Sequence, residues 1–149
     1  MKKHQEIIQK LFENDEYSRS LGIVLDELTD TTIRMHMRLG RAMLNFYGRP
    51  HGAAIYSLAD AAFSVLGNNT NTISVALDCS ITYHASPEPG SLLVVEGEDL
   101  SVNRRTGSYI FTVYMDNDGR RMLIATMKSL SYRTGRPIDP DVEQSNTFR

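Results

Sequence analysis

One unbroken segment constrains the fold of this chain most. Residues 52–66, GAAIYSLADAAFSVL, contain no Pro and no internal Gly. They are rich in strong helix formers, and Gly67 followed by two Asn residues supplies a stop signal, so the segment predicts one α-helix of about four turns. Apolar side chains lie almost all the way round this helix. A helix of that kind has to be buried, and the rest of the chain must therefore enclose it.

Asp60 is the exception on this apolar helix. Apart from the Tyr56 phenol, it is the only ionisable side chain between the two helix ends. Burying a carboxylate without partners is costly. Ser57 and Ser64 share its face of the helix and are expected to line a polar slot with it. Two interpretations follow: a structural carboxylate held by hydroxyls and backbone amides, or a catalytic one.

The start of the predicted helix carries a second chemical feature. Pro50 favours an extended approach and lacks an amide hydrogen, so the amides of Gly52 and Ala53 are expected to point outward at the positive end of the helix dipole. Such amides stabilise a developing oxyanion, and the missing Cβ of Gly52 allows a ligand to approach closely. The alternative is a helix start that binds no ligand.

These features belong to a pattern that extends along most of the chain. Asn45, the His51-Gly52 pair and the segment Ser57–Asp60 resemble the signature of hotdog-fold thioesterases of the phenylacetate-degradation (PaaI-like) type. The resemblance covers about Leu21 to Arg133 and has further matches at Ile81-Thr82-Tyr83, Pro87, Gly90 and the Arg104-Arg105-Thr106-Gly107 turn. It implies an α+β fold, in which a curved antiparallel sheet wraps around one long buried central helix.

The resemblance also implies an activity and roles for the residues of the signature. The reaction is hydrolysis of acyl- or aryl-CoA thioesters to a free acid and coenzyme A, so coenzyme A is part of the substrate and no separate cofactor is expected. Asp60 would be the general base or the nucleophile, and the Gly52 amide would be the oxyanion donor. Asn45 and His51 would orient the loop before the helix.

Substrate contacts are implied at two places. Arg104 and Arg105 would face the nucleotide end of coenzyme A, although two adjacent cations at a turn are most simply a solvated hairpin end. Tyr56, Phe63 and Ser64 on the central helix would border the substrate.

Two positions depart from the family pattern. Ala53 stands where the second Gly of His-Gly-Gly is usual, which narrows the approach to the backbone without removing an amide. Ala76 stands where some relatives carry a Ser that helps to hold the attacking water. Ser64 or Ser74 are the candidates to replace it.

Helix geometry predicts how such a site is assembled. Gly52 and Asp60 are eight residues apart, which is about 12 Å along one helix. Reacting atoms must come within about 3.5 Å, so one chain cannot bring both groups to one carbonyl. In a dimer with antiparallel helices, Gly52 of one subunit faces Asp60 of the other. We therefore expect a homo-oligomer, either a dimer or a dimer of dimers.

Composition excludes several other classes of protein. The 149 residues carry a net charge of −2, which predicts neither a nucleic-acid nor a membrane partner. Cys79 is the only cysteine, and the His and Cys residues lack metal-ligand spacing, so no metal is expected. No apolar run reaches the roughly 18 residues that span a bilayer, and no signal core follows Met1, so we expect a cytoplasmic location. Phosphate-loop, dinucleotide-binding and Gly-x-Ser-x-Gly motifs are absent.

The remaining patterns divide the chain into three segments. Residues 1–20 contain an amphipathic helix, residues 21–138 form a single hotdog thioesterase domain, and residues 139–149 are a polar tail with a loose end. Two strands before the central helix and four after it are joined by short turns, which favours antiparallel pairing. The strand Ile73–Tyr83 alternates, so one face is predicted to be buried: Val75, Leu77, Cys79, Ile81 and Tyr83.

Two other functions remain open at this point. A hotdog acyl-thioester hydratase or dehydratase would need a His-Asp acid–base pair at the α and β carbons of the substrate, and His51-Gly52 at a helix start fits an oxyanion site better. A non-catalytic acyl-CoA-binding protein would not need the buried acid at Asp60.

Overall fold

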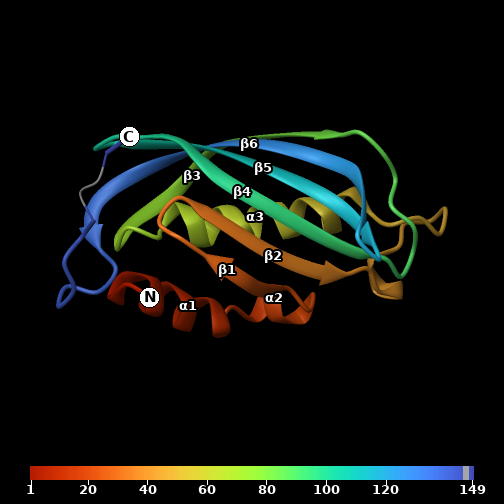
Figure 1. The fold of residues 1–149 in the computed structure, drawn as a ribbon, viewed down its shortest axis with the longest axis horizontal. Coiled ribbons are helices and arrows are strands. Elements are labelled where there is room, and N and C mark those ends of the chain that lie inside the picture. The colour runs from red at the N-terminus through yellow and green to blue at the C-terminus, as the bar shows by residue number, and fades with distance from the viewer. Residues whose placement is uncertain (146–147) are drawn as a thin grey trace.

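The structure is a computed structural model that describes residues 1–145 and 148–149 (Figure 1). Its elements follow the predicted order, with one further short helix, α2. The helices are α1 (Lys3–Glu13), α2 (Glu16–Ser20) and α3 (Gly52–Gly67), and a 3₁₀ turn lies at Arg41–Met43. The strands are β1 (Val24–Leu28), β2 (Thr32–Arg38), β3 (Thr72–Tyr83), β4 (Leu92–Val102), β5 (Thr106–Asn117) and β6 (Arg120–Pro137). In the described ranges, no helix has the length and apolarity needed to cross a bilayer.

The six strands form one sheet that curves around α3. Their order is β1-β2-β4-β5-β6-β3, and every neighbouring pair is antiparallel. The connection from β2 through α3 to β3 therefore leads across the sheet to its far edge. Figure 1 shows α3 between the sheet and the two N-terminal helices. The predicted arrangement, an antiparallel sheet wrapped around one long helix, is confirmed.

Small residues on α3 allow the sheet to approach it closely. The small residues Ala59 and Ala62 are fully buried, and so is the larger Leu58 beside them. The opposing sheet surface is equally apolar, because alternate residues of β2 and β5 point inward and are buried. The carboxylate of Asp60 thus lies on a helix whose other faces are packed in the core.

The N-terminal helices cover the side of α3 that the sheet leaves open. The Tyr17 hydroxyl of α2 lies 2.7 Å from Ser57 Oγ, and Ser57 Oγ also donates to the Ala53 carbonyl oxygen at 2.8 Å. Ser57 is therefore engaged with α2 and its own helix. This corrects the expectation that it shares a polar slot with Asp60.

β3 differs from the predicted strand because of a β-bulge. The register shifts between Ala76 and Asp78, which leaves Leu77 unpaired. A bulge adds one residue to the strand, so the side chains that face α3 are at even-numbered positions before Leu77 and at odd-numbered positions after it. Ala76 points toward α3 before the bulge, and Cys79 packs against the core after it. The prediction of one buried face is wrong for three of its members, which are exposed: Val75, Leu77 and Tyr83.

The C-terminal tail is attached to the body of the protein. Asn71 Nδ2 donates to the carbonyl oxygens of Asp139 at 2.9 Å and Val142 at 2.6 Å. The backbone of Arg149 exchanges two hydrogen bonds with Val102, each 2.9 Å long. The expected loose end is therefore not found at these residues, and residues 146 and 147 lie outside the described part of the chain.

Candidate active site

The start of α3 is capped by its own histidine. His51 is the N-cap residue, and its Nδ1 accepts a hydrogen bond from the Ala53 amide at 3.1 Å. The Ala54 amide donates to the His51 carbonyl oxygen at 3.0 Å. The Ala53 amide is thus engaged, which corrects the expectation of two outward amides. The Gly52 amide makes no hydrogen bond within the described part of the chain, so it remains as a donor at the positive end of the helix dipole.

Asn45 shapes the loop that leads into this helix. Its Oδ1 accepts hydrogen bonds from the amides of Tyr47 at 2.9 Å and Arg49 at 3.1 Å. Gly48, at φ +74°, completes the turn in a conformation that L side chains rarely adopt. The loop therefore depends on Asn45 for its shape. A part for Asn45 in catalysis stays a prediction.

Tyr83 is a residue beside Gly52 that sequence analysis did not assign to the site. Its hydroxyl donates to the Gly52 carbonyl oxygen at 3.1 Å, and a Cβ at Gly52 would lie 3.3 Å from the Tyr83 ring. A cavity of about 380 Å³ opens here, lined by Pro50, Gly52, Ile55, Tyr83 and residues 84–87. The match of Ile81-Thr82-Tyr83 to the family pattern is the signal in the sequence that could have identified this tyrosine.

Asp60 lies in a second cavity, near the other end of α3. This cavity has a volume of about 150 Å³ and receives residues of α3, β3 and β6. The two serines predicted as candidates to hold a water, Ser64 and Ser74, line it. Ala76, at the position where some relatives carry a Ser, lines it as well. Ser131 also lines it and was not predicted. The complete lining is Asp60, Phe63, Ser64, Gly67, Asn68, Ser74, Val75, Ala76 and Ser131.

The carboxylate of Asp60 is partly buried and has a raised pKa. It makes no hydrogen bond or ion pair with the described residues. Burial raises the pKa of Asp60 above its ordinary value, and the nearby Asp15 carboxylate raises it further. A structural carboxylate would be expected to have hydrogen-bond donors around it. A partly desolvated carboxylate without such donors is instead suited to accept a proton or to attack an electrophile.

The two cavities are separate from each other within one chain. They share no lining residue, and Gly52 and Asp60 are about 12 Å apart along the helix axis. The free amide and the free carboxylate therefore cannot meet at one carbonyl carbon within a single subunit. The described residues contain no group of three potential metal ligands in either place.

The two aromatic residues predicted to border the substrate differ in position. Phe63 lines the Asp60 cavity and packs against the rings of Tyr109 and Phe111, with centroids 5.5 and 6.0 Å away. Tyr56 lines neither cavity. It faces Cys79, and hydrogen bonding with this thiol, together with burial, raises the pKa of Tyr56 to about 12.

Arg104 and Arg105 lie at the exposed turn between β4 and β5. Neither guanidinium forms an ion pair or hydrogen bond with the described residues. The Arg105 carbonyl oxygen accepts a hydrogen bond from the Arg133 amide at 2.7 Å. Farther along the ladder, Gly107 pairs with Ser131 of the Asp60 cavity. Arg105 thus lies two residues before Gly107, whose ladder partner Ser131 lines that cavity. Both guanidinium groups are without a partner among the described residues.

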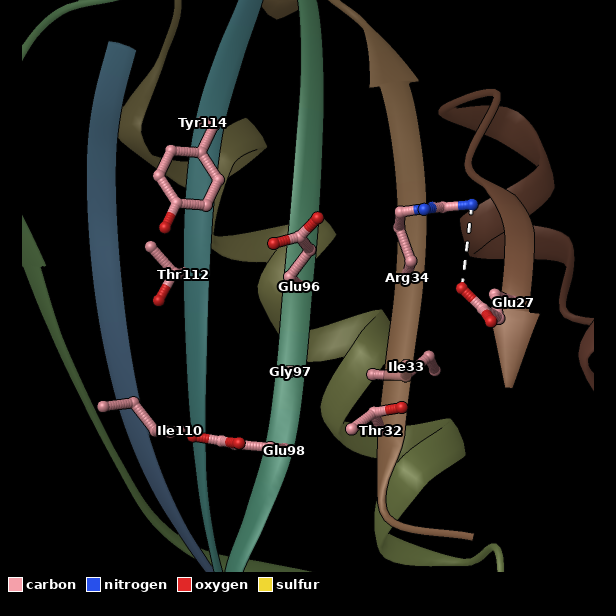
Figure 2. A pocket seen from close by; sticks show the side chains of 10 residues that line it. All are labelled: Glu27, Thr32, Ile33, Arg34, Glu96, Gly97, Glu98, Ile110, Thr112 and Tyr114. Carbon is pink, nitrogen blue, oxygen red and sulfur yellow. Dashed lines mark ion pairs between the residues drawn. The ribbon is translucent and has the colours of Figure 1, made fainter. Parts of the chain in front are cut away.

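A third hollow lies on the outer face of the sheet, away from α3. It has a volume of about 360 Å³ and is lined by residues of β1, β2, β4 and β5. Figure 2 shows Arg34 pointing toward Glu27, with which it forms a 3.7 Å ion pair, while Glu96 and Glu98 project from β4. These side chains are exposed or half-buried, and none of the candidate catalytic residues is among them. The candidate site residues therefore remain those at the start of α3 and around Asp60.

Comparison with known protein families places these residues in a wider context. The family model described as the Thioesterase superfamily matches residues 47–121. The matched segment includes Gly52, Asp60 and the Arg104–Arg105 turn. Asn45 lies just before it, and Ser131 lies after it.

Individual relatives extend over most of the chain. The acyl-coenzyme A thioesterase PaaI of Escherichia coli K12 is 26% identical over 128 residues, which is 86% of this chain and 89% of the relative. The structure of the E. coli PaaI protein from the phenylacetic acid degradation operon superposes with a TM-score of 0.85 at 24% identity, over 91% of this chain and 96% of that one. A hypothetical thioesterase protein of Streptococcus pneumoniae, determined with coenzyme A, gives a TM-score of 0.76 at 21% identity, over 87% and 98% of the two chains. The fold predicted for the chain is confirmed by these structures.

Proposed function

Because the chain belongs to the thioesterase superfamily and is a thioester hydrolase, we propose that it hydrolyses acyl- or aryl-CoA thioesters to a free acid and coenzyme A. Its similarity to a relative named as an acyl-CoA thioesterase supports this substrate class. The observation that carries the proposal is chemical. A carboxylate without hydrogen-bond donors in the middle of a buried helix and an amide without an acceptor at the start of the same helix are both left unpaired within the described residues.

The active site is composed of two subunits. If two copies of α3 run antiparallel across a two-fold axis, the Gly52 end of one helix meets the Asp60 end of the other, and two equivalent sites form. The edge of the sheet supports such an assembly. β3 is an edge strand of 12 residues with exposed Val75 and Leu77, and a long apolar edge is a surface that proteins normally cover. The complete assembly is a dimer or a dimer of dimers.

In this composite site each half supplies one part of the chemistry. The Gly52 amide donates to the thioester oxygen, and a single donor of this kind contributes roughly 3 kcal/mol to the transition state. Asp60 of the partner subunit acts in one of two ways. It takes a proton from the attacking water, or it attacks the carbonyl carbon itself. With Asp60 as the base, the water oxygen bonds to the acyl carbon, the carbon–sulfur bond breaks, and the proton held by Asp60 passes to the coenzyme A thiolate. With Asp60 as the nucleophile, its oxygen bonds to the acyl carbon as the carbon–sulfur bond breaks, and a water then hydrolyses the mixed anhydride, which releases the acid, restores the carboxylate and supplies the proton for the thiolate.

A turnover screen tests this function directly. The purified protein is incubated with acyl-CoA esters of short, medium and aryl acyl groups, and the released thiol is measured. We expect hydrolysis of at least one class well above the uncatalysed rate. The absence of turnover across the whole panel would contradict the proposed activity. The same screen discriminates against a hydratase, which would add water to an unsaturated acyl-CoA without releasing thiol.

Arg104 and Arg105 are expected to hold the phosphates of coenzyme A. Replacing both by Ala removes two charge-assisted contacts and should raise KM for acyl-CoA about tenfold, with little change in kcat. The effect should nearly vanish with an acyl pantetheine, which lacks the nucleotide. The matched control removes the other adjacent pair, Arg120 and Arg121, at the β5–β6 turn. Equal KM effects on both substrates, or from both double variants, would reassign the pair to a surface turn.

The charge of Asp15 is expected to set the pH at which Asp60 works. Asp15 raises the pKa of Asp60, so Asp15→Asn should lower it. Asn keeps the cap of α2, which Asp15 forms by accepting from the Ser18 amide at 3.0 Å. Since the base must be ionised to act, the acid limb of kcat against pH should move to lower pH in this variant. An acid limb that stays in place would contradict the assignment of Asp60 as the titrating group.

A further inference from the structure

The bulge in β3 directs the side chain of Tyr83 toward α3. Tyr83 is the last residue of the strand, six residues after the unpaired Leu77. Without the extra residue, Tyr83 would lie on the outward face with Val75. With it, the Tyr83 hydroxyl reaches the first turn of α3. Bulges next to active sites re-aim side chains in this way, and this one brings Tyr83 to Gly52.

The Tyr83 hydroxyl holds one of the two peptide groups that flank the Gly52 Cα. It donates to the Gly52 carbonyl oxygen at 3.1 Å. The nitrogen of the same peptide group, that of Ala53, donates to His51 Nδ1 at 3.1 Å. This peptide group is thus held at both ends. Burial raises the pKa of Tyr83, which keeps the hydroxyl protonated and able to donate.

The other flanking peptide group is held at its oxygen and open at its nitrogen. The His51 carbonyl oxygen accepts from the Ala54 amide at 3.0 Å, and the His51 amide donates to the Met43 carbonyl oxygen at 2.7 Å. The open nitrogen is that of Gly52, which has no acceptor among the described residues. Three of the four polar groups around the Gly52 Cα are therefore engaged, and the fourth is the candidate oxyanion donor.

The direction of the Gly52 N–H depends on these bonds because glycine has more backbone freedom than any other residue. The bond from Tyr83 restricts ψ of Gly52, since it fixes the plane of the peptide group that follows. The Tyr83 ring also restricts which residue can stand at this position. A Cβ at Gly52 would lie 3.3 Å from the ring Cζ and 3.4 Å from the hydroxyl oxygen. A side chain there would displace the ring and lengthen the hydrogen bond.

We propose that Tyr83 is a positioning residue that aims the Gly52 amide at the thioester oxygen. The inference rests on the proposed function and adds a residue of β3 to the oxyanion part of the site. Tyr83 itself exchanges no proton with the substrate. Its hydroxyl holds the Gly52 carbonyl, and the fixed peptide group keeps the preceding N–H in one direction. An oxyanion donor works through its preorganisation, so freedom of this N–H would reduce the rate of the chemical step.

Tyr83→Phe removes the hydroxyl and keeps the ring. It should lower kcat about tenfold with KM unchanged, and by the same factor for every acyl-CoA of the screen, because the carbonyl is common to all of them. The matched control is Tyr114→Phe on the outer face of the sheet, whose hydroxyl makes no hydrogen bond with the described residues. It should leave both parameters at the wild-type values. A wild-type kcat in Tyr83→Phe, or a raised KM that varies with the acyl group, would overturn the inference and leave the proposed function standing.

A double variant tests whether Tyr83 acts through Gly52. Gly52→Ala displaces the Tyr83 ring and should lower kcat by itself. Adding Tyr83→Phe should then lower kcat by less than about threefold, since the bond that it removes is already weakened. A further tenfold loss in this background would show that the two residues act independently, which contradicts the proposed role.

Hydrogen exchange provides a measurement that does not depend on turnover. In Tyr83→Phe the amides of Ala53 and Ala54 should exchange several-fold faster than in the wild type, while amides in the middle of α3 keep their rates. Unchanged exchange at the first turn would overturn the inference, even if kcat falls. A wild-type protein without turnover on the whole panel would instead refute the proposed function itself.

Discussion

Asp60→Asn abolishes turnover while acyl-CoA still binds. This is the expected result because the amide keeps the shape of the side chain and loses its basicity, so binding of the ground state survives and the transition state is not reached. General-base catalysis typically contributes 100- to 10,000-fold, and we expect kcat to fall by about this factor. The measurement is kcat from thiol release, together with acyl-CoA affinity from equilibrium titration.

Stability provides an independent check on the same variant. Burial raises the pKa of Asp60 in the folded state, so ionisation of this group costs stability as the pH rises through the interval from its unfolded to its folded pKa. At neutral pH Asp60→Asn should therefore have a higher melting temperature than the wild type, and below this interval the two should converge. Asp118→Asn, at the exposed β5–β6 turn where Asn tolerates φ +52°, is the control. Near wild-type kcat in Asp60→Asn would show that the carboxylate is structural.

A randomly reassorted mixture of two inactive variants regains about a quarter of wild-type activity. Asp60→Asn leaves Asn45 and Gly52 intact, and Asn45→Ala, which removes the acceptor that closes the 45–49 loop, leaves Asp60 intact. Each homodimer is damaged in both sites. A mixed dimer collects both lesions in one site and leaves the other whole. Random reassortment gives about half mixed dimers with one sound site in two, hence about a quarter of the activity.

The experiment uses two differently tagged variants that are co-expressed or refolded together. Hydrolysis of acyl-CoA is measured for the whole mixture and for each homodimer. Dimers that carry both tags are then isolated from the mixture, and they should have about half of the wild-type activity. A site contained within one chain would give no recovery. Confirmed mixed dimers without regained activity would contradict the shared site, even if both single variants behave as expected.

The central helix and its acid could be predicted from the sequence because they are local features. An apolar segment with a stop signal at Gly67 specifies a buried helix without reference to the rest of the chain, and a carboxylate within it stands out by contrast. The register of β3 could not be predicted in this way. The bulge at Leu77 forms where β3 pairs with β6, and the alternation of side chains does not reveal which residue the pairing leaves out.

Ser131 and His51 also differ in whether their structural roles depend on residues nearby in the sequence or on residues of other strands. The sequence gives no sign that Ser131 lines the Asp60 cavity, because its position depends on its ladder neighbours from two other strands, Ala76 and Gly107. The cap at His51 is local, but histidine is not among the usual N-cap residues, so the loss of the Ala53 amide to this cap was missed. Residues whose role depends on long-range pairing require the structure.

The position of α3 in the chain has a consequence for synthesis on the ribosome. β1 and β2 precede the helix, whereas β3, β4, β5 and β6 follow it. A growing chain therefore completes its most apolar helix before four of its six covering strands exist, and such exposed apolar surface favours aggregation. The earlier helices α1 and α2 are already made at that stage, and the contact of Tyr17 with Ser57 needs no later residue. The N-terminal helices can thus shield α3 as it emerges, before the sheet closes over it.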